Sequence, residues 1–137
     1  MISNKFFSFK IVSSDGKIFT DNINELYIRN SNNDIVGVLA NHYKMVVNVP
    51  ISIFKIIKEN KETKFVTSGG ILNVKDNIVT LLCDTFEKED ELDKERALKE
   101  KEYALGKLSV VDKDDIEKVN EFEFSLKKAI NRLSLFN

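Results

Sequence analysis

The feature that most constrains the fold of this chain is an abrupt change in residue pattern near residue 87. Residues 1–86 contain the only proline, four of the five glycines and most of the Val, Ile and Phe. Residues 87–137 contain 25 of the 43 charged residues and no proline. The composition of residues 1–86 is typical of short strands joined by turns, and that of residues 87–137 is typical of charged amphipathic helices. We therefore predict two domains, residues 1–86 and residues 87–137.

The first domain shows the alternation of strands that bury one face. Phe7, Phe9 and Ile11 alternate with Ser8 and Lys10, so apolar side chains point one way and polar ones the other. Turn-forming clusters recur at intervals of about 8–17 residues, which is typical of a sandwich or barrel of short antiparallel strands. The clusters are residues 14–16, 30–34, 59–61, 68–70 and 75–77.

The second domain shows the spacing of two amphipathic helices. Apolar residues recur every three or four positions over residues 116–133, and a second stripe covers residues 92–108. Asp90 or Asp93 can cap the first helix, and Asp112 can cap the second. The short connection predicts an antiparallel hairpin. A hairpin of this size has little core of its own, so its apolar side must pack on a neighbouring surface.

Composition argues against several functions. The net charge is −1, which gives no basic surface for nucleic acid. No apolar run approaches the ~18–20 residues that a membrane-spanning helix needs. One histidine and one cysteine cannot build the usual zinc site, and we expect no metal. Cys83 lies in an apolar run without a basic neighbour, so we interpret it as a small buried hydrophobe rather than a reactive thiol.

The search for catalytic motifs is negative. The sequence contains no glycine-rich dinucleotide or phosphate loop and no nucleophile elbow. His42, the only histidine, has no identifiable partner for general-base catalysis, so we favour a structural or interface role over a catalytic one. An unrelated hydrolase is therefore the weakest interpretation, for want of a nucleophile and base.

One group of charges is more suggestive. Arg96 lies in the first turns of the first predicted helix, and Lys128 and Arg132 lie one turn apart near the end of the second. An antiparallel hairpin brings these two ends together, where several cations could hold a phosphate chain. The alternative is that they are ordinary surface charges that pair with Glu95 or Glu89.

Six short motifs resemble a known family. In chain order they match its opening hairpin, its "G-I-L-P-x-H" segment, its "F-x-V-S-G-G" strand end, its "V-T-V-L-A-D-T" strand, its "I/L-D-x-x-R-A" helix start and the end of its second helix. They are residues 13–19 (SSDGKIF), 37–42 (GVLANH), 65–70 (FVTSGG), 79–85 (VTLLCDT), 92–97 (LDKERA) and 128–133 (KAINRL). The chain thus resembles, over essentially its full length, the epsilon subunit of bacterial and plastid F-type ATP synthases.

The resemblance implies an N-terminal antiparallel β-sandwich followed by a C-terminal antiparallel two-helix hairpin, without catalytic activity or a required cofactor. It implies a place in the central stalk, bound to the gamma subunit and to the rotor ring of c subunits, on the cytoplasmic face of the bacterial inner membrane or in a plastid. In such a subunit the hairpin is regulatory. When extended, it reaches the alpha/beta catalytic head and restrains ATP hydrolysis.

The resemblance also implies site residues. Asp93, Arg96 and Arg132 match positions that bind regulatory ATP in some bacterial members; Lys128 and Tyr103 stand where those members carry further arginines. His42 matches a position near gamma, and the Asn30–Asp34 turn, with Asp34, is expected to contact the rotor ring. The alternative is a free regulatory module that binds nucleotide through the hairpin cations.

Overall fold

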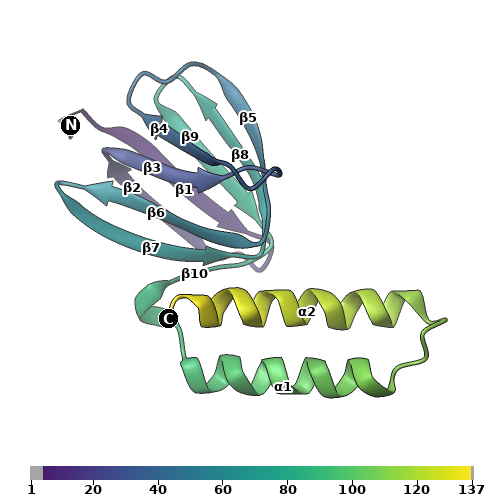
Figure 1. Cartoon of the computed structure of the whole chain (residues 1–137). Helices are drawn as coiled ribbons and strands as arrows, with labels where there is room; N and C mark the ends of the chain where they lie inside the picture. Colours follow the sequence, from purple (N-terminus) through teal and green to yellow (C-terminus); the bar gives the residue numbers. More distant parts are fainter. Residues whose placement is uncertain (1–4, 137) are drawn as a thin grey trace. The chain divides into compact units, whose positions relative to one another are not determined.

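The computed structural model describes residues 5–136 (Figure 1). The chain divides into two compact units, Met1–Asp90 and Glu91–Asn137. The described part of the first unit is built of strands, and that of the second is built of two helices. The strands are β1 (Phe7–Ser13), β2 (Ile18–Ile23), β3 (Glu25–Arg29), β4 (Ile35–Leu39), β5 (Met45–Val49), β6 (Ser52–Lys58), β7 (Lys61–Thr67), β8 (Gly70–Lys75), β9 (Ile78–Cys83) and β10 (Phe86–Lys88). A short 3-10 turn, Glu89–Glu91, precedes the helices α1 (Lys94–Val110) and α2 (Ile116–Ser134).

The strands form two five-stranded sheets packed face to face. One sheet has the order β2-β1-β9-β8-β5 and the other β10-β7-β6-β3-β4. Neighbouring strands are antiparallel except β1 and β9, which run parallel with Phe9 opposite Val79. Two separate sheets make a sandwich rather than a barrel. The predicted fold class, a β-sandwich followed by a two-helix hairpin, is confirmed, and the parallel pair is a feature that local sequence patterns did not predict.

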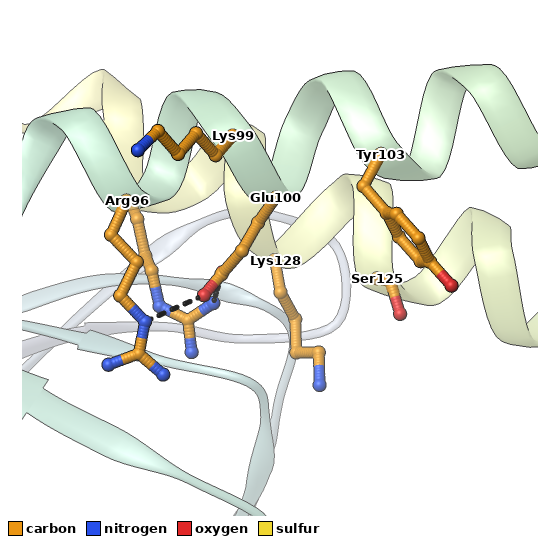
Figure 2. A pocket seen from close by; sticks show the side chains of 7 residues that line it. Arg96, Lys99, Glu100, Tyr103, Ser125 and Lys128 are labelled. Atoms are coloured by element: carbon orange, nitrogen blue, oxygen red, sulfur yellow. Dashed lines mark hydrogen bonds and ion pairs between the residues drawn. The ribbon is translucent and has the colours of Figure 1, made fainter.

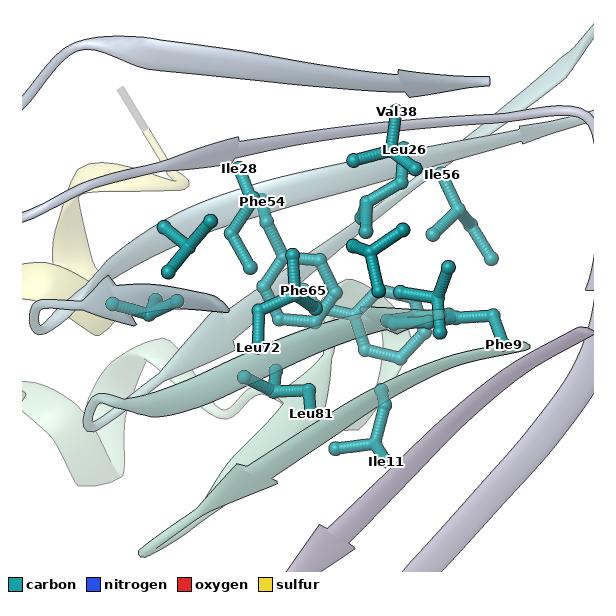
Figure 3. Close-up of a cluster of buried hydrophobic side chains, with 14 of the residues drawn as sticks. Phe9, Ile11, Leu26, Ile28, Val38, Phe54, Ile56, Phe65, Leu72 and Leu81 are labelled. Atoms are coloured by element: carbon teal, nitrogen blue, oxygen red, sulfur yellow. The ribbon is translucent and has the colours of Figure 1, made fainter. Parts of the chain in front are cut away.

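The core of the sandwich lies between the two sheets and is rich in phenylalanine (Figure 3). Phe9, Phe54 and Phe65 are almost completely buried. The rings of Phe54 and Phe65 stack with their centroids 4.9 Å apart, and Phe9 meets Phe54 edge-on at 6.1 Å. Both arrangements suit the quadrupoles of the rings. The alternating residues of β1 supply one side of this core, as their pattern predicts.

The turns use residues that tolerate a left-handed backbone. Asp76 and Asn77 connect β8 to β9 with φ angles of 53° and 62°. Two consecutive positive φ values define the hairpin turn whose twist matches that of the flanking strands, and Asn and Asp accept this conformation more readily than most residues.

The helical hairpin has carboxylate caps at both helix starts. Of the two predicted candidates, Asp90 and Asp93, it is Asp93 that caps α1, and it accepts a hydrogen bond from the backbone N–H of Arg96 at 3.1 Å. The prediction that Asp112 caps α2 is wrong, because Asp115 holds that position. Asp112 instead lies in the turn that precedes α2, where its side chain accepts a hydrogen bond from the N–H of Asp114 at 3.0 Å. The buried side chains of the two helices are all alanines: Ala97, Ala104 and Ala129.

Candidate functional site

The hairpin carries a groove between its two helices (Figure 2). The groove has a volume of about 620 Å³. It brings together three of the predicted cations, Arg96 from α1 and Lys128 and Arg132 from α2, at the end of the hairpin where α1 begins. Asp93 does not line it, because its carboxylate caps α1. The complete lining is Arg96, Lys99, Glu100, Tyr103, Ser125, Lys128 and Arg132.

Glu100 is a groove residue that was not predicted from the sequence, and it pairs with both arginines of the groove. One of its carboxylate oxygens lies 3.1 Å from Nε of Arg96, and the other lies 3.2 Å from Nη1 of Arg132. The proposed partners Glu95 and Glu89 do not pair with these arginines: Glu95 lies 3.7 Å from Lys99, and Glu89 accepts the backbone N–H of Lys64. The four-residue spacing of Arg96 and Glu100 was a usable signal for the first contact.

The rest of the groove is less charged and partly aromatic. The ammonium of Lys128 lies 4.6 Å from the centre of the Phe124 ring, which stabilises the cation without neutralising it. Tyr103 and Ser125 line the groove farther along the helices, away from Arg96 (Figure 2). Four cations and one carboxylate therefore surround a space large enough for a small polyanion.

The two predicted contact residues of the sandwich lie at opposite ends of β4. Asp34 precedes β4 in the Asn30–Asp34 turn, where its N–H donates to Oδ1 of Asn30 at 3.0 Å. His42 follows β4, is half-buried, and stacks on the exposed Tyr43 with ring centroids 4.4 Å apart. The turn before His42 is anchored by the amide of Asn77, which donates to Oδ1 of Asn41 at 2.9 Å. The structure therefore does not bring Asp34 and His42 into one site.

A further surface lies on the outer face of the β2-β1-β9-β8-β5 sheet. The cross-strand register sets Val12 opposite both Ile18 and Leu82, and Leu82 opposite Ile71. Ile18, Leu82 and Ile71 are 58%, 56% and 49% exposed. We call these four residues the apolar row. The fourteen outward positions of these strands include only two charged residues, Lys10 and Lys75.

Cys83 is buried at the end of β9. Burial raises the pKa of its thiol above the ordinary value, because the charged thiolate loses hydration. The thiol is therefore protonated at neutral pH, which supports the interpretation as a small core residue.

The fold and these surfaces define a class of binding protein, a β-sandwich followed by an antiparallel helical hairpin. The family descriptions that match the chain are "ATP synthase, Delta/Epsilon chain, beta-sandwich domain" over residues 6–89 and "ATP synthase, Delta/Epsilon chain, long alpha-helix domain" over residues 90–137. The chain belongs to this family, whose members are non-catalytic subunits of the ATP synthase central stalk. The resemblance drawn from the six motifs is thereby confirmed.

Individual relatives match over nearly the whole chain. The ATP synthase epsilon chain of Caldicellulosiruptor bescii is 33% identical, with 94% of this chain and 92% of the relative covered. That of Clostridium novyi is 36% identical, with 96% and 98% covered. Among solved structures, a chain of the Euglena gracilis mitochondrial ATP synthase has a TM-score of 0.78 at 20% identity, with 100% of this chain and 89% of that one covered.

The subunit is part of a membrane-associated complex. Neither of the helices in the described residues is long and apolar enough to cross a bilayer. The described residues also contain no group of three or more His, Cys, Asp or Glu side chains arranged to hold a metal ion.

Proposed function

We propose that this chain connects the gamma subunit to the rotor ring of an F-type ATP synthase, on the cytoplasmic face of a bacterial inner membrane. The similar Euglena chain comes from an assembly described as OSCP/F1/c-ring. A Tetrahymena thermophila chain with a TM-score of 0.63 at 11% identity comes from one described as central stalk/c-ring. In this proposal the sandwich transmits rotation, and the hairpin regulates ATP hydrolysis.

The observation that carries the proposal is the apolar row. Exposed aliphatic side chains that are aligned across four neighbouring strands form a flat surface, and such patches mark protein interfaces more often than a scattered exposed residue does. A surface with few charges can be covered at little desolvation cost. We assign this face to the gamma subunit.

The position of His42 supports the same assignment. His42 and Tyr43 lie one residue before β5, the edge strand of the sheet that carries the apolar row. Val46 of β5 is strongly exposed on that face. We therefore extend the surface assigned to gamma from the apolar row to the stacked rings of His42 and Tyr43. The Asn30–Asp34 turn, at the other end of β4, is left to contact the rotor ring.

The gamma assignment predicts that Leu82→Asp weakens the complex with gamma by ~100-fold or more, because an unpaired carboxylate would be buried in an apolar interface. Leu82 is largely exposed, so the sandwich itself should fold normally. Binding is measured by titrating purified gamma against each variant. Asn32→Asp, which adds the same charge in the opposite turn, should bind gamma like the wild type. A Leu82→Asp variant with unchanged affinity would contradict the assignment.

The regulatory proposal is supported by the way the hairpin is built. It is a compact unit whose buried side chains are three alanines, while larger apolar residues such as Val110 and Ile116 are exposed. Little apolar area is buried inside such a unit, so only a few kcal/mol would separate alternative packing arrangements of the hairpin. A hairpin of this kind can exchange one neighbouring surface for another.

Deletion of residues 91–137 is therefore expected to raise ATP hydrolysis by the assembled enzyme several-fold, because the restraining element is removed. The truncated chain should still bind gamma, since the sandwich and its apolar row remain intact. Steady-state hydrolysis by the purified complex is the measurement. Unchanged hydrolysis, with the truncated subunit shown to be present in the complex, would rule out inhibition by the hairpin.

We further propose that the hairpin groove binds ATP as a regulatory ligand, with low affinity. Arg96, Lys128 and Arg132 line it together, and Lys99 adds a fourth cation. Lysine supplies charge but not the planar fork of arginine, so Lys128 would hold a phosphate less specifically than an arginine would. This site belongs to the subunit, and a free nucleotide-binding module is not needed to explain it.

A further inference from the structure

The most informative contact in the groove is the bridge that Glu100 makes between the two helices. Its two carboxylate oxygens receive one guanidinium from α1, that of Arg96, and one from α2, that of Arg132 (Figure 2). The side chain of Arg132 is only 21% exposed, and that of Glu100 is 39% exposed. Partial burial strengthens the Arg132 arm of the bridge relative to an ordinary surface ion pair, whereas the side chain of Arg96 is 79% exposed and its arm is screened by solvent.

A carboxylate and a phosphate group use the same features of a guanidinium. Both present anionic oxygens to its N–H groups, and arginine binds both in the same manner. The space between Arg96 and Arg132 is therefore the place where a phosphate group of a ligand would find its strongest partners in the groove. Glu100 already fills that place with an anion that belongs to the protein.

We infer that Glu100 is a built-in competitor for the anion site of the hairpin and sets its affinity for nucleotide. This inference rests on the proposal that the groove binds ATP. A triphosphate must either displace the Glu100 carboxylate from both arginines or share them with it. Displacement breaks the two ion pairs that Glu100 makes. Sharing places the Glu100 carboxylate beside the phosphate groups, and these negative charges repel. Either way, the affinity is lower than four cations alone would give.

The same geometry gives Glu100 a second effect, because its carboxylate stabilises the hairpin when no ligand is bound. Without its negative charge, Arg96 and Arg132 would face each other across the helix pair without the carboxylate between them. Repulsion between them would weaken the hairpin in the absence of a ligand. An added polyanion would then restore the lost stability, because it would replace the missing carboxylate.

The test uses the full chain as wild type, Glu100→Gln and Glu102→Gln. Glu102 is exposed on the same helix and does not line the groove, so its substitution changes the net charge equally and serves as the control. ATP and inorganic tripolyphosphate are titrated separately by calorimetry. We expect Glu100→Gln to bind both about tenfold more tightly than the wild type, and Glu102→Gln to bind like the wild type.

Thermal unfolding of the helical signal, followed by circular dichroism, gives the second measurement. Without ligand, Glu100→Gln should melt below Glu102→Gln, and tripolyphosphate should raise its midpoint more than it raises the midpoint of the wild type. Glu100→Met, which keeps the length and helix propensity of the side chain, should behave in the same way if the amide of Gln disturbs the fold.

The outcomes separate the inference from the proposal on which it rests. If the wild type binds ATP and Arg132→Gln abolishes binding, but Glu100→Gln binds no more tightly than Glu102→Gln, the competitor role is wrong and the ATP site stands. If neither the wild type nor Glu100→Gln binds ATP or tripolyphosphate at millimolar concentration, both are wrong. Tighter binding of ATP alone, without tripolyphosphate, would also overturn the inference, because the gain would not arise at the phosphate site.

Discussion

Replacement of Gly70 by alanine is expected to prevent the sandwich from folding. A Cβ atom at this position would lie 1.9 Å from the carbonyl oxygen of Leu82 and 2.7 Å from Cα of Cys83. Both atoms belong to the backbone of β9, which pairs with β8 in this region, so neither can move without breaking the β8–β9 register. We expect a loss of more than about 4 kcal/mol, comparable to the whole stability of a small domain.

The measurement is thermal unfolding of Gly70→Ala beside Gly106→Ala. Gly106 lies within α1, and a Cβ there would meet nothing within 4 Å. Alanine at that position should stabilise the helix by about 0.5–1 kcal/mol, because glycine is the poorer helix former. The same substitution should thus have opposite effects in the two units. A Gly70→Ala variant that is soluble and melts like the wild type would show that β8 and β9 do not approach each other this closely.

Replacement of Phe65 by alanine is expected to cost about 3–5 kcal/mol of unfolding free energy. Its ring is fully buried and meets three other aromatic rings, so the substitution removes apolar area and leaves a cavity. The centroids of Phe54, Phe19 and Phe86 lie 4.9 Å, 5.2 Å and 6.5 Å from its own. Denaturant titration of the full chain measures the change in midpoint.

Phe6→Ala provides the matched control for this prediction. Phe6 is 44% exposed, so truncation of its side chain should cost less than about 1 kcal/mol. If the two substitutions change the denaturation midpoint equally, the packing of rings around Phe65 does not dominate the core. A larger effect of Phe6→Ala would locate the critical packing outside the space between the sheets.

Local patterns were sufficient to predict the two kinds of architecture. The inward residues of β1 were predicted from alternation alone, because the orientation of a strand residue depends only on its parity. The spacing of α2 predicted a one-sided apolar stripe, but within the hairpin Ile116 and Ile130 are exposed and the side chain that α2 buries is that of Ala129. The cap at Asp115 was missed because Asp112, Asp114 and Asp115 are all good capping residues, and the choice between them depends on how the connection folds.

Two further unpredicted features, the apolar row and the contact of Glu100 with Arg132, depend on pairing between distant residues. The apolar row exists only because β1 lies parallel to β9, which brings Val12 beside Leu82. In the sequence each of these residues looks like an ordinary member of its own strand. The contact of Glu100 with Arg132 likewise requires the register of α1 against α2, which the sequence of neither helix specifies.

Asp34 directly precedes β4 (Ile35–Leu39), and a turn at Ala40 and Asn41 separates the end of this strand from His42. The five residues of the extended strand alone span about 17 Å. An extended chain is already close to its maximum length, so tension applied at one end reaches the other without elongation. If two rotating components of the enzyme bind at these two ends, the sandwich forms a rigid connection between them. The elastic compliance of the rotor must then reside in other components.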